Sequence, residues 1–407
     1  MKILLVCEDL PGKMVGGLGK HVVTLGNALM AAGNEVTLMG HSGVDYEQCK
    51  AEMGFKGSFI AGFPHLIKGW KEKSLGFFNP MKRPYFAKLL AKGILEHEGQ
   101  FDVIHYHGHL PMVARHIPKE VNFLQTRHDQ GSDCITHVRF KAGQVCTERS
   151  ASACATCIHP APGAIRTRLS SIAVERYRRE VVAAFQQHPV IFVSDFLRKN
   201  FIKIIPTAHL NKAHVIHNFV DEARLHAVCQ TDAPPQTSTT SSSIRVHITG
   251  RLDEAKGIAP LLDLMEQRLP IGWHVDIYGD GPLMPAIKAK HSSKAVTFHG
   301  HRLYDETIAA TSKATVVVVP SVCEESCGTV ILEALRLGKI CYALGRGGTP
   351  ELVRYGATGQ LRLFDNLESL VSDLTSTTNF TDQVGGESAD VQAAINQLTA
   401  LYSGKRS

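Results

Sequence analysis

Two series of short, continuous apolar runs divide this sequence, and stretches with helical spacing lie between most of them. A strand that is apolar on successive residues is buried on both faces, as in a parallel sheet covered by helices. The first forty residues show the unit most plainly, because the strands KILLVCE and NEVTLMG flank the helical stretch GGLGKHVVTLGNALMAAG. This βαβ pattern predicts an α/β fold. Further strands of the first series are predicted at 101–107, 121–129, 189–194 and 213–219.

The second series follows a polar stretch, CQTDAPPQTSTTSSS, which has the composition of a linker. Its strands are predicted at 244–250, 273–279, 295–300, 314–320 and 339–344. We therefore predict two doubly wound, Rossmann-like domains that face each other across a cleft. The predicted domains span residues 1–228 and 244–386, the linker spans 229–243, and an amphipathic helix at 387–402 packs back on the first domain.

Composition and charge exclude several classes of protein. No run of about 18 apolar residues predicts a membrane-spanning helix, and residues 1–7 are too short for a signal-peptide core. Ten cysteines in 407 residues do not resemble a secreted disulfide framework. We expect a cytoplasmic protein. Its net charge of +6 fits an anionic ligand or an anionic membrane surface and compels neither.

Glycines between the first strand and the first helix, at Gly16 and Gly17, are a candidate ligand contact. Glycine lets the backbone approach a ligand closely, and the free N–H groups of a helix N-terminus bind anions. The alternative is an ordinary tight turn. The GxGxxG pattern of dinucleotide-binding enzymes is absent, which disfavours a nicotinamide cofactor.

Cations and carboxylates follow two strands of the second series. Arg251 and Lys256 lie in GRLDEAKG. The forked guanidinium of Arg251 and the ammonium of Lys256 suit a diphosphate. The alternative is that both are solvated surface cations. In PSVCEESCGTVILEALRLGK, Glu325 precedes a predicted helix and Glu333 lies near its second turn. Carboxylates accept hydrogen bonds from sugar hydroxyls, whereas helix N–H groups hold phosphate. The alternative is that Glu325 caps the helix and Glu333 is exposed. The helix N–H groups that would hold phosphate are those of Gly328, Thr329 and Val330.

These segments, in this order, resemble the retaining GT-B glycosyltransferases of family 4, also called group 1. The resemblance covers nearly the whole chain. It rests on GGLGKHVVTLGNALMAAGNEVTLM, FDVIHYHGH, FVSDFLRKN, VIHNFVDEARL, TGRLDEAKG, IYGDGP, ESCGTVILE and GGTPELV. Two positions depart from the family pattern: Ser326-Cys327 follow the first glutamate, and Phe219 stands where glycine is common.

The resemblance implies a role for each matching residue. The first domain would bind the acceptor and the second the nucleotide-sugar donor. Catalytic roles fall to His107 beside the transferred sugar, Glu325 on its hydroxyls, and Arg251 and Lys256 on the departing diphosphate. Donor contacts fall to Gly16, Gly17, Gly328, Thr329, Val330 and to Glu333 on the ribose, and acceptor contacts to His128 and Asp129. No cofactor is expected for catalysis, because the cations replace a metal.

Four cysteines within 24 residues, Cys134, Cys146, Cys154 and Cys157, are candidate ligands of a structural zinc ion or iron–sulfur cluster. His137 and His159 are alternative ligands, and unligated thiols in an insertion are the competing interpretation. Residues 66–92 interleave cations with aromatic side chains. That composition suits peripheral contact with an anionic membrane, or a solvated helix pair on the first domain. No motif predicts nucleic-acid binding.

The sequence therefore predicts transfer of a sugar from a UDP- or GDP-sugar to a glycan or lipid-linked glycan. Cell-surface polysaccharide biosynthesis is the expected setting, at the inner face of the membrane if residues 66–92 contact it. The alternative is a non-catalytic nucleotide-sugar binder or a metal-cluster scaffold of the same fold.

Overall fold

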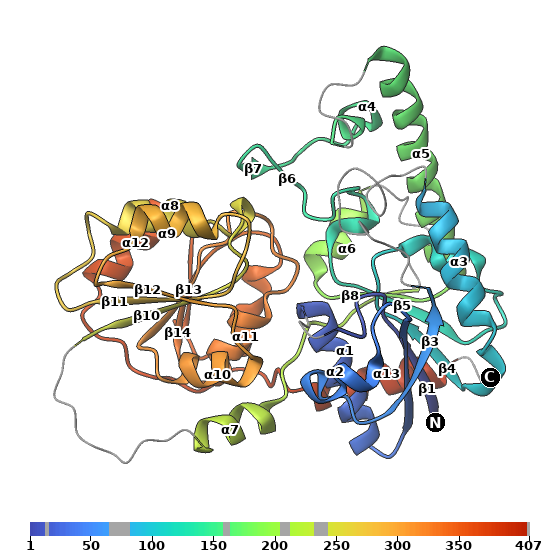
Figure 1. The fold of residues 1–407 in the computed structure, drawn as a ribbon, viewed down its shortest axis with the longest axis horizontal. Helices are drawn as coiled ribbons and strands as arrows, with labels where there is room; N and C mark the ends of the chain where they lie inside the picture. Colours follow the sequence, from blue (N-terminus) through green and yellow to red (C-terminus); the bar gives the residue numbers. More distant parts are fainter. Residues whose placement is uncertain (13–15, 65–81, 158–162, 204–211, 232–242, 405–407) are drawn as a thin grey trace. The chain divides into compact units, whose positions relative to one another are not determined.

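The computed structural model of the chain describes residues 1–12, 16–64, 82–157, 163–203, 212–231 and 243–404 (Figure 1). The chain forms two compact units. The first contains residues 1–139, 147–217 and 391–407, and the second contains residues 140–146 and 218–390. Each unit is built on its own parallel sheet, so the predicted α/β class is confirmed.

The sheet of the first unit has seven strands in the order β3-β2-β1-β4-β5-β8-β9, and all of its pairs are parallel. The strands are β1 (Lys2–Val6), β2 (Glu35–His41), β3 (Ser58–Phe63), β4 (Val103–Tyr106), β5 (Phe123–Arg127), β8 (Val190–Phe192) and β9 (Ala213–Val215). The helices are α1 (Gly17–Ala31), α2 (Tyr46–Met53), α3 (Arg83–Leu95), α4 (Ala151–Ala155), α5 (Ala164–Gln187), α6 (Asp195–Ile202) and α13 (Val391–Ser403). β3 was not predicted, because SFIAGF is only half-buried at the edge of the sheet and lacks a continuous apolar signature.

The sheet of the second unit has six parallel strands in the order β12-β11-β10-β13-β14-β15. The strands are β10 (Arg245–Thr249), β11 (His274–Tyr278), β12 (Val296–Gly300), β13 (Val316–Val319), β14 (Ile340–Leu344) and β15 (Leu361–Phe364). The helices are α7 (Glu222–Thr231), α8 (Ile258–Met265), α9 (Met284–His291), α10 (Tyr304–Ser312), α11 (Thr329–Arg336) and α12 (Leu367–Ser376). In Figure 1, α8, α9 and α12 lie on one face of this sheet, and α10 and α11 lie on the other. Both faces are thus covered, which is why the strand VVVV is buried at every residue.

The units divide at residues 217 and 218, whereas the sequence predicted a boundary at 228. Residues after 217 join the second unit through specific contacts: Val220 N–H donates to the Ala389 carbonyl at 3.0 Å, and Glu222 pairs with Arg336 at 2.9 Å. These contacts join residues far apart in sequence, so composition alone did not reveal them. Of the predicted linker, residues 232–242 lie outside the described residues.

The last helix, α13, packs against α1 of the first unit. It begins at Val391, later than the predicted 387, because Glu387 N–H donates to the Arg354 carbonyl and Asp390 bridges to Val220. The buried Tyr402 fixes its far end: the Tyr402 hydroxyl lies 2.8 Å from Nδ1 of the buried His105.

We expect Tyr402→Phe to lower the free energy of unfolding by about 2 kcal/mol, because it leaves a buried imidazole nitrogen without its hydrogen-bond partner. Urea unfolding followed by circular dichroism would measure this. Tyr85→Phe is the control, since Tyr85 is 63% exposed and should not change the free energy. Equal stability of Tyr402→Phe and the parent chain would show that this hydrogen bond does not anchor α13.

A two-stranded antiparallel hairpin, β6 (Phe140–Lys141) and β7 (Gln144–Val145), interrupts the cysteine-containing segment.

No helix in the described part of the chain combines the length and the apolar character needed to cross a membrane.

Candidate active site

Both sheets reverse their strand order at one point. In the first unit β2 and β4 lie on opposite sides of β1, and in the second unit β11 and β13 lie on opposite sides of β10. Ligands of open parallel sheets bind beyond the carboxyl ends of the strands at such a switch point. The loops after β1 and β4 carry Glu8 and His107, and the loops after β10 and β13 carry Lys256 and Glu325. The sequence-predicted residues therefore flank the switch point of each unit.

In the second unit, the Lys256 ammonium contacts the Glu325 carboxylate, with Nζ and Oε1 2.5 Å apart. The Ser321 hydroxyl donates to the same oxygen at 2.5 Å. The two loops meet through their backbones, because the N–H groups of Val322 and Cys323 both donate to the Ala255 carbonyl. Gly257 permits this approach: its φ is 66°, and a Cβ there would lie 2.2 Å from the Pro320 carbonyl oxygen.

The pair is charged at neutral pH. Burial disfavours the ammonium of Lys256, but the adjacent Glu325 carboxylate outweighs burial and raises the pKa of Lys256. Burial likewise disfavours the carboxylate of Glu325, but the Lys256 charge and the hydrogen bonds from Lys256 and Ser321 lower its pKa. The Lys256 cation is therefore fixed beside the Glu325 carboxylate. Both of these side-chain contacts use Oε1 of Glu325, and Oε2 has no hydrogen bond among the described residues.

Arg251 lies on the same loop as Lys256 but has a different partner. Its Nε is 3.5 Å from Asp253 Oδ2, and its side chain is 69% exposed. Asp253 also caps the short helix that carries Lys256, because its side chain accepts from the Lys256 N–H at 3.2 Å. The exposed guanidinium of Arg251 is thus tethered next to the loop and remains accessible to an anion.

The helix α11 begins without a side-chain cap. Its N-cap residue is Gly328, and no side chain accepts from the N–H groups of Thr329 or Val330 within the described residues. Glu325 bonds to Lys256 and Ser321, so the alternative that it caps α11 is wrong. The helix ends before Gly338, which has a φ of 80°. The N-terminus of α11 is therefore available to an anion.

Two neighbouring features were not predicted. The Glu333 carboxylate is a hydrogen-bond partner of the Tyr304 hydroxyl, and both burial and this carboxylate raise the pKa of Tyr304. The side-chain amide of Asn218 donates to the Cys327 carbonyl at 2.8 Å, which holds the loop before α11. Cys327 and Phe219, at the two departures from the family pattern, are both buried. Packing therefore accounts for their apolar character.

In the first unit, Gly16 is the N-cap of α1, again without a side-chain cap. A Cβ added at Gly16 or Gly17 would meet no atom within 4 Å. Local packing therefore does not demand glycine at these positions, which leaves close approach of a ligand as a reason for them.

The loops after β4 and β5 form a charged network around Asp129. Asp129 Oδ2 lies 3.2 Å from His109 Nδ1 and 2.8 Å from His137 Nδ1, and Asp9 Oδ2 lies 3.3 Å from His109 Nε2. Burial disfavours charge on His109, but Asp129 and Asp9 raise its pKa to about 10. Burial also disfavours the Asp129 carboxylate, yet His137 and His109 hold the pKa of Asp129 well below its usual range.

A second histidine group lies next to this network. His107 Nδ1 is 3.1 Å from His128 Nε2, and His21 of α1 packs against both rings, with centroids 5.3 Å from His107 and 4.5 Å from His128. The predicted residues His107 and His128 are thus brought together, whereas His128 and Asp129 belong to two different groups. The sequence missed His21, because nothing in GGLGKHVV marks that helix position.

Glu8 is a further buried carboxyl group that sequence reasoning missed. The Tyr106 hydroxyl and the His109 N–H donate to its Oε1. Its other oxygen, Oε2, has no hydrogen-bond partner among the described residues. Burial raises the pKa of Glu8 to about 7. The buried glutamate is therefore half protonated near neutral pH.

We expect Glu8→Gln to stabilise the protein at pH 8 by about 3 kcal/mol and to have little effect at pH 4.5. A carboxyl group whose pKa is raised by folding, here from 4.5 to about 7, favours the folded state at low pH, and that contribution is lost as pH rises through 7. Urea unfolding at the two pH values would measure it. Glu47→Gln, at an exposed position, is the control. An equal effect of Glu8→Gln at both pH values would contradict the assignment.

The four cysteines do not form one of the compact ligand groups of the described residues. Two groups bring three ligand atoms within 4.8 Å of one another, and neither contains a cysteine. Cys134 Sγ is 3.2 Å from the Thr136 hydroxyl, and Arg178 donates to Cys154 Sγ at 3.3 Å. The donor set still suits zinc or an iron–sulfur cluster, so the four-cysteine metal site stays a prediction. His159, an alternative ligand, lies outside the described residues.

Of the basic and aromatic segment 66–92, residues 66–81 lie outside the described residues. The remainder belongs largely to α3, where the buried Arg83 reaches the Ile135 carbonyl and lies over the Tyr177 ring. Arg83 thus anchors α3 within the first unit, as expected of a helix that covers the domain.

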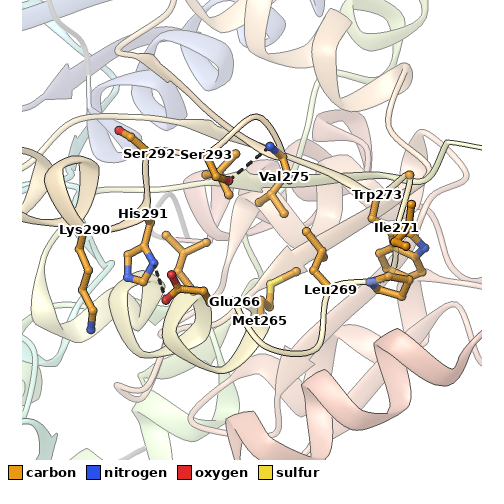
Figure 2. Close-up of a pocket in the computed structure, with 15 residues that line it drawn as sticks. Met265, Glu266, Leu269, Ile271, Trp273, Val275, Lys290, His291, Ser292 and Ser293 are labelled. Atoms are coloured by element: carbon orange, nitrogen blue, oxygen red, sulfur yellow. Dashed lines mark hydrogen bonds and ion pairs between the residues drawn. The ribbon is translucent and has the colours of Figure 1, made fainter.

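A pocket of about 320 Å³ lies elsewhere in the second unit (Figure 2). Trp273, Val275 and Val296 line it from the amino ends of β11 and β12, and His291 closes it from the end of α9. It therefore opens at the edge of the sheet opposite the switch point and is not part of the candidate active site.

Two Rossmann-like units, with cations, carboxylates and an uncapped helix at a switch point, are typical of GT-B glycosyltransferases. Two family descriptions match the chain: Glycosyltransferase Family 4 over residues 15–224, and Glycosyl transferases group 1 over residues 243–379. The chain belongs to this glycosyltransferase family, and the predicted resemblance is confirmed.

Relatives and solved structures agree with this assignment. Alpha-maltose-1-phosphate synthase of Mycobacterium tuberculosis is 24% identical over 237 residues, which are 54% of this chain and 56% of that protein. The match thus spans little more than half the length of these curated relatives.

Two solved structures share the fold along their whole length, each with a TM-score of 0.66. HepE from Anabaena, in complex with UDP and glucose, is 17% identical, with 99% of this chain and 100% of that chain covered. Sucrose-phosphate synthase from Thermosynechococcus elongatus is 18% identical, with 99% and 98% covered.

Proposed function

We propose that this chain is a retaining glycosyltransferase that moves a sugar from a nucleotide-sugar to a saccharide acceptor. The observation that carries the proposal is the contact between Lys256 and Glu325 at the switch point of the second unit, next to the uncapped N-terminus of α11. A cation, a carboxylate and free helix N–H groups together suit a ligand that has both phosphates and hydroxyls.

The donor is assigned to the second unit. Arg251, Lys256 and the N–H groups of Gly328, Thr329 and Val330 bind the diphosphate, and Glu333 accepts hydrogen bonds from the ribose hydroxyls. Glu325, held by Lys256, accepts hydrogen bonds from the transferred sugar. HepE, solved with UDP and with UDP-glucose, supports a uridine nucleotide as the first candidate.

The first unit is assigned to the acceptor. His107 lies beside the transferred sugar, Gly16 and Gly17 allow the backbone to approach the donor phosphate or the acceptor, and His128 and Asp129 line the acceptor side. The relatives' names, which include a maltose-1-phosphate synthase, a sucrose-phosphate synthase and a starch synthase, all denote saccharide products. These names support a saccharide acceptor. Our proposed acceptors are glycans, including lipid-linked glycans of cell-surface polysaccharides, with transfer on the cytoplasmic side of the membrane.

The mechanism follows from the charges. As the bond to the diphosphate breaks, positive charge develops on the sugar ring and negative charge on the leaving phosphate. Arg251, Lys256 and the α11 N–H groups stabilise the leaving group most strongly when its charge is greatest, which lowers the barrier. The acceptor hydroxyl then attacks from the face that the diphosphate leaves and gives its proton to the departing phosphate oxygen, so the configuration of the sugar is retained. The charge of the two cations serves where other transferases use a metal ion.

Calorimetric titration with UDP-, GDP- and ADP-sugars tests this proposal. We expect selective binding of one nucleotide class and weaker binding by Glu325→Gln. Glu266→Ala is the matched control, because Glu266 is exposed and lines the pocket at the opposite edge of the sheet. Equal affinity of all variants, or binding of none of the donors, would contradict the assigned donor site. Binding without any transfer would favour a non-catalytic nucleotide-sugar binder.

A further inference from the structure

Three histidines from separate elements of the first unit bring one ligand nitrogen each to within 4.8 Å of the other two. His107 follows β4, His128 follows β5, and His21 lies in the second turn of α1. β4 pairs with both β1 and β5, so the carboxyl ends of adjacent strands place these side chains together. The group is therefore carried by rigid elements of the fold and not by a mobile loop.

The chemical state of the group suits metal coordination. Burial lowers the pKa of His21 to about 3 and holds the pKa values of His107 and His128 well below their usual range. Burial thus favours the neutral form of each imidazole, which is the form that ligates a metal ion. His107 is fully buried, and its Nε2 has no hydrogen-bond partner among the described residues. His107 Nδ1 and His128 Nε2 share a hydrogen bond at 3.1 Å, which a bound ion would replace.

His105 supports the group without joining it. Its ring lies against His107, with the centroids 3.9 Å apart. Tyr402 and Thr126 occupy its two nitrogens at 2.8 and 2.7 Å. His105 is thus fixed as a packing partner that restricts the orientation of the His107 ring.

The neighbouring group of His109, Asp129 and His137 has equally short distances but differs in its charges. Arg83 Nη2 lies 3.0 Å from His137 Nε2, and Arg127 Nη2 lies 3.7 Å from Asp129 Oδ1. Arg127 already pairs with that carboxylate, Arg83 occupies the far nitrogen of His137, and both guanidinium groups would repel a cation from this group. We therefore assign no ion there, which leaves the three-histidine group as the better candidate.

We propose that His21, His107 and His128 form a binding site for a divalent transition metal of the zinc, cobalt and nickel class. Three imidazoles with no carboxylate in the set favour these ions over Mg²⁺ or Ca²⁺, and leave a coordination position for water or a hydroxyl group. A second consequence rests on the proposed function: because His107 lies beside the transferred sugar, the ion competes with the sugar and inhibits transfer reversibly.

Titration of the metal-free chain with Co²⁺ tests the site itself, without any assay of activity. The chain should carry Cys134→Ser, Cys146→Ser, Cys154→Ser and Cys157→Ser, so that none of these candidate thiolates binds the ion. We expect one equivalent of Co²⁺, visible d–d absorption and no sulfur-to-metal charge-transfer band. Zn²⁺ should displace the Co²⁺.

His21→Phe and His128→Phe keep an aromatic ring but remove the ligand nitrogen, and each should weaken Co²⁺ binding by about 100-fold or more, beyond the range typical of lost partners of metal ligands. His226→Ala, at an exposed position in the second unit, is the control and should bind as the parent does. Near-ultraviolet circular dichroism verifies that each variant is folded. Absence of Co²⁺ binding by the parent, or equal binding by folded His21→Phe and His128→Phe, would overturn the site and leave the donor-binding titrations unaffected.

Discussion

Replacing Lys256 with methionine is expected to lower kcat for sugar transfer by roughly 100- to 1,000-fold, the range typical of one lost electrostatic contact to a developing anion. Lys256 is fixed 2.5 Å from Glu325, so its charge is positioned before the donor binds. Methionine has nearly the same length and no charge, so the fall in kcat can be attributed to the missing ammonium charge. The measurement is the turnover number with the donor that binds in calorimetry.

A structural explanation predicts a different pattern. Lys256→Met leaves the buried Glu325 carboxylate without its cation, which destabilises the loop. The double variant Lys256→Met/Glu325→Gln removes both charges and should regain thermal stability, but it should not regain turnover. Recovery of turnover in the double variant, or an unchanged kcat in the single variant, would contradict a role for the Lys256 charge in the reaction.

Glu333→Ala is expected to weaken binding of the free nucleotide diphosphate by about 10- to 100-fold, because a carboxylate that accepts from ribose hydroxyls contributes about 1.5–3 kcal/mol. The loss should be the same for the nucleotide and for the nucleotide-sugar, since Glu333 is assigned to the part that they share. Glu325→Gln should instead weaken only the nucleotide-sugar. Isothermal titration with both ligands measures the four affinities.

Tyr304→Phe is the matched control for Glu333, because the Tyr304 hydroxyl already occupies that carboxylate. Removing the hydroxyl takes away one competitor for the Glu333 carboxylate, so affinity for the nucleotide should stay equal or increase. If Glu333→Ala binds the nucleotide as tightly as the parent does, Glu333 serves only to hold Tyr304 and the assignment to the ribose fails.

The fold was predictable from the sequence because buried parallel strands are continuous apolar runs. VVVV and KILLV are continuous apolar runs, and both are central, buried strands. The start of α11 was equally predictable, since Gly328 and Gly338 enclose an amphipathic stretch that the structure places at Thr329–Arg336. Edge strands such as β3 are half-buried and carry a weaker signal.

The site was predictable only where its residues lie in a motif. Two separate motifs predict Glu325 and Lys256 as site residues. In the structure their side chains form a hydrogen bond, although they are 69 positions apart in the sequence. Four site residues were not predicted, because the contacts that place them in the site are formed only in the fold: Glu8, His21, Tyr304 and Ser321. The alternating histidines of HYHGH did carry a signal, since side chains two apart on a strand share a face, and the ring centroids of His105 and His107 lie 3.9 Å apart.

The anomeric outcome of donor turnover distinguishes a retaining glycosyltransferase from an inverting one and from a non-catalytic binder. Proton NMR of the chain with its α-linked nucleotide-sugar would follow the slow transfer of the sugar to water, and to added oligosaccharide acceptors. For a retaining glycosyltransferase, the α-anomer should appear first, nucleotide diphosphate should be released in step with it, and Lys256→Met should suppress both signals. Appearance of the β-anomer first, or an intact donor bound by a folded chain in the presence of acceptors, would contradict a retaining glycosyltransferase.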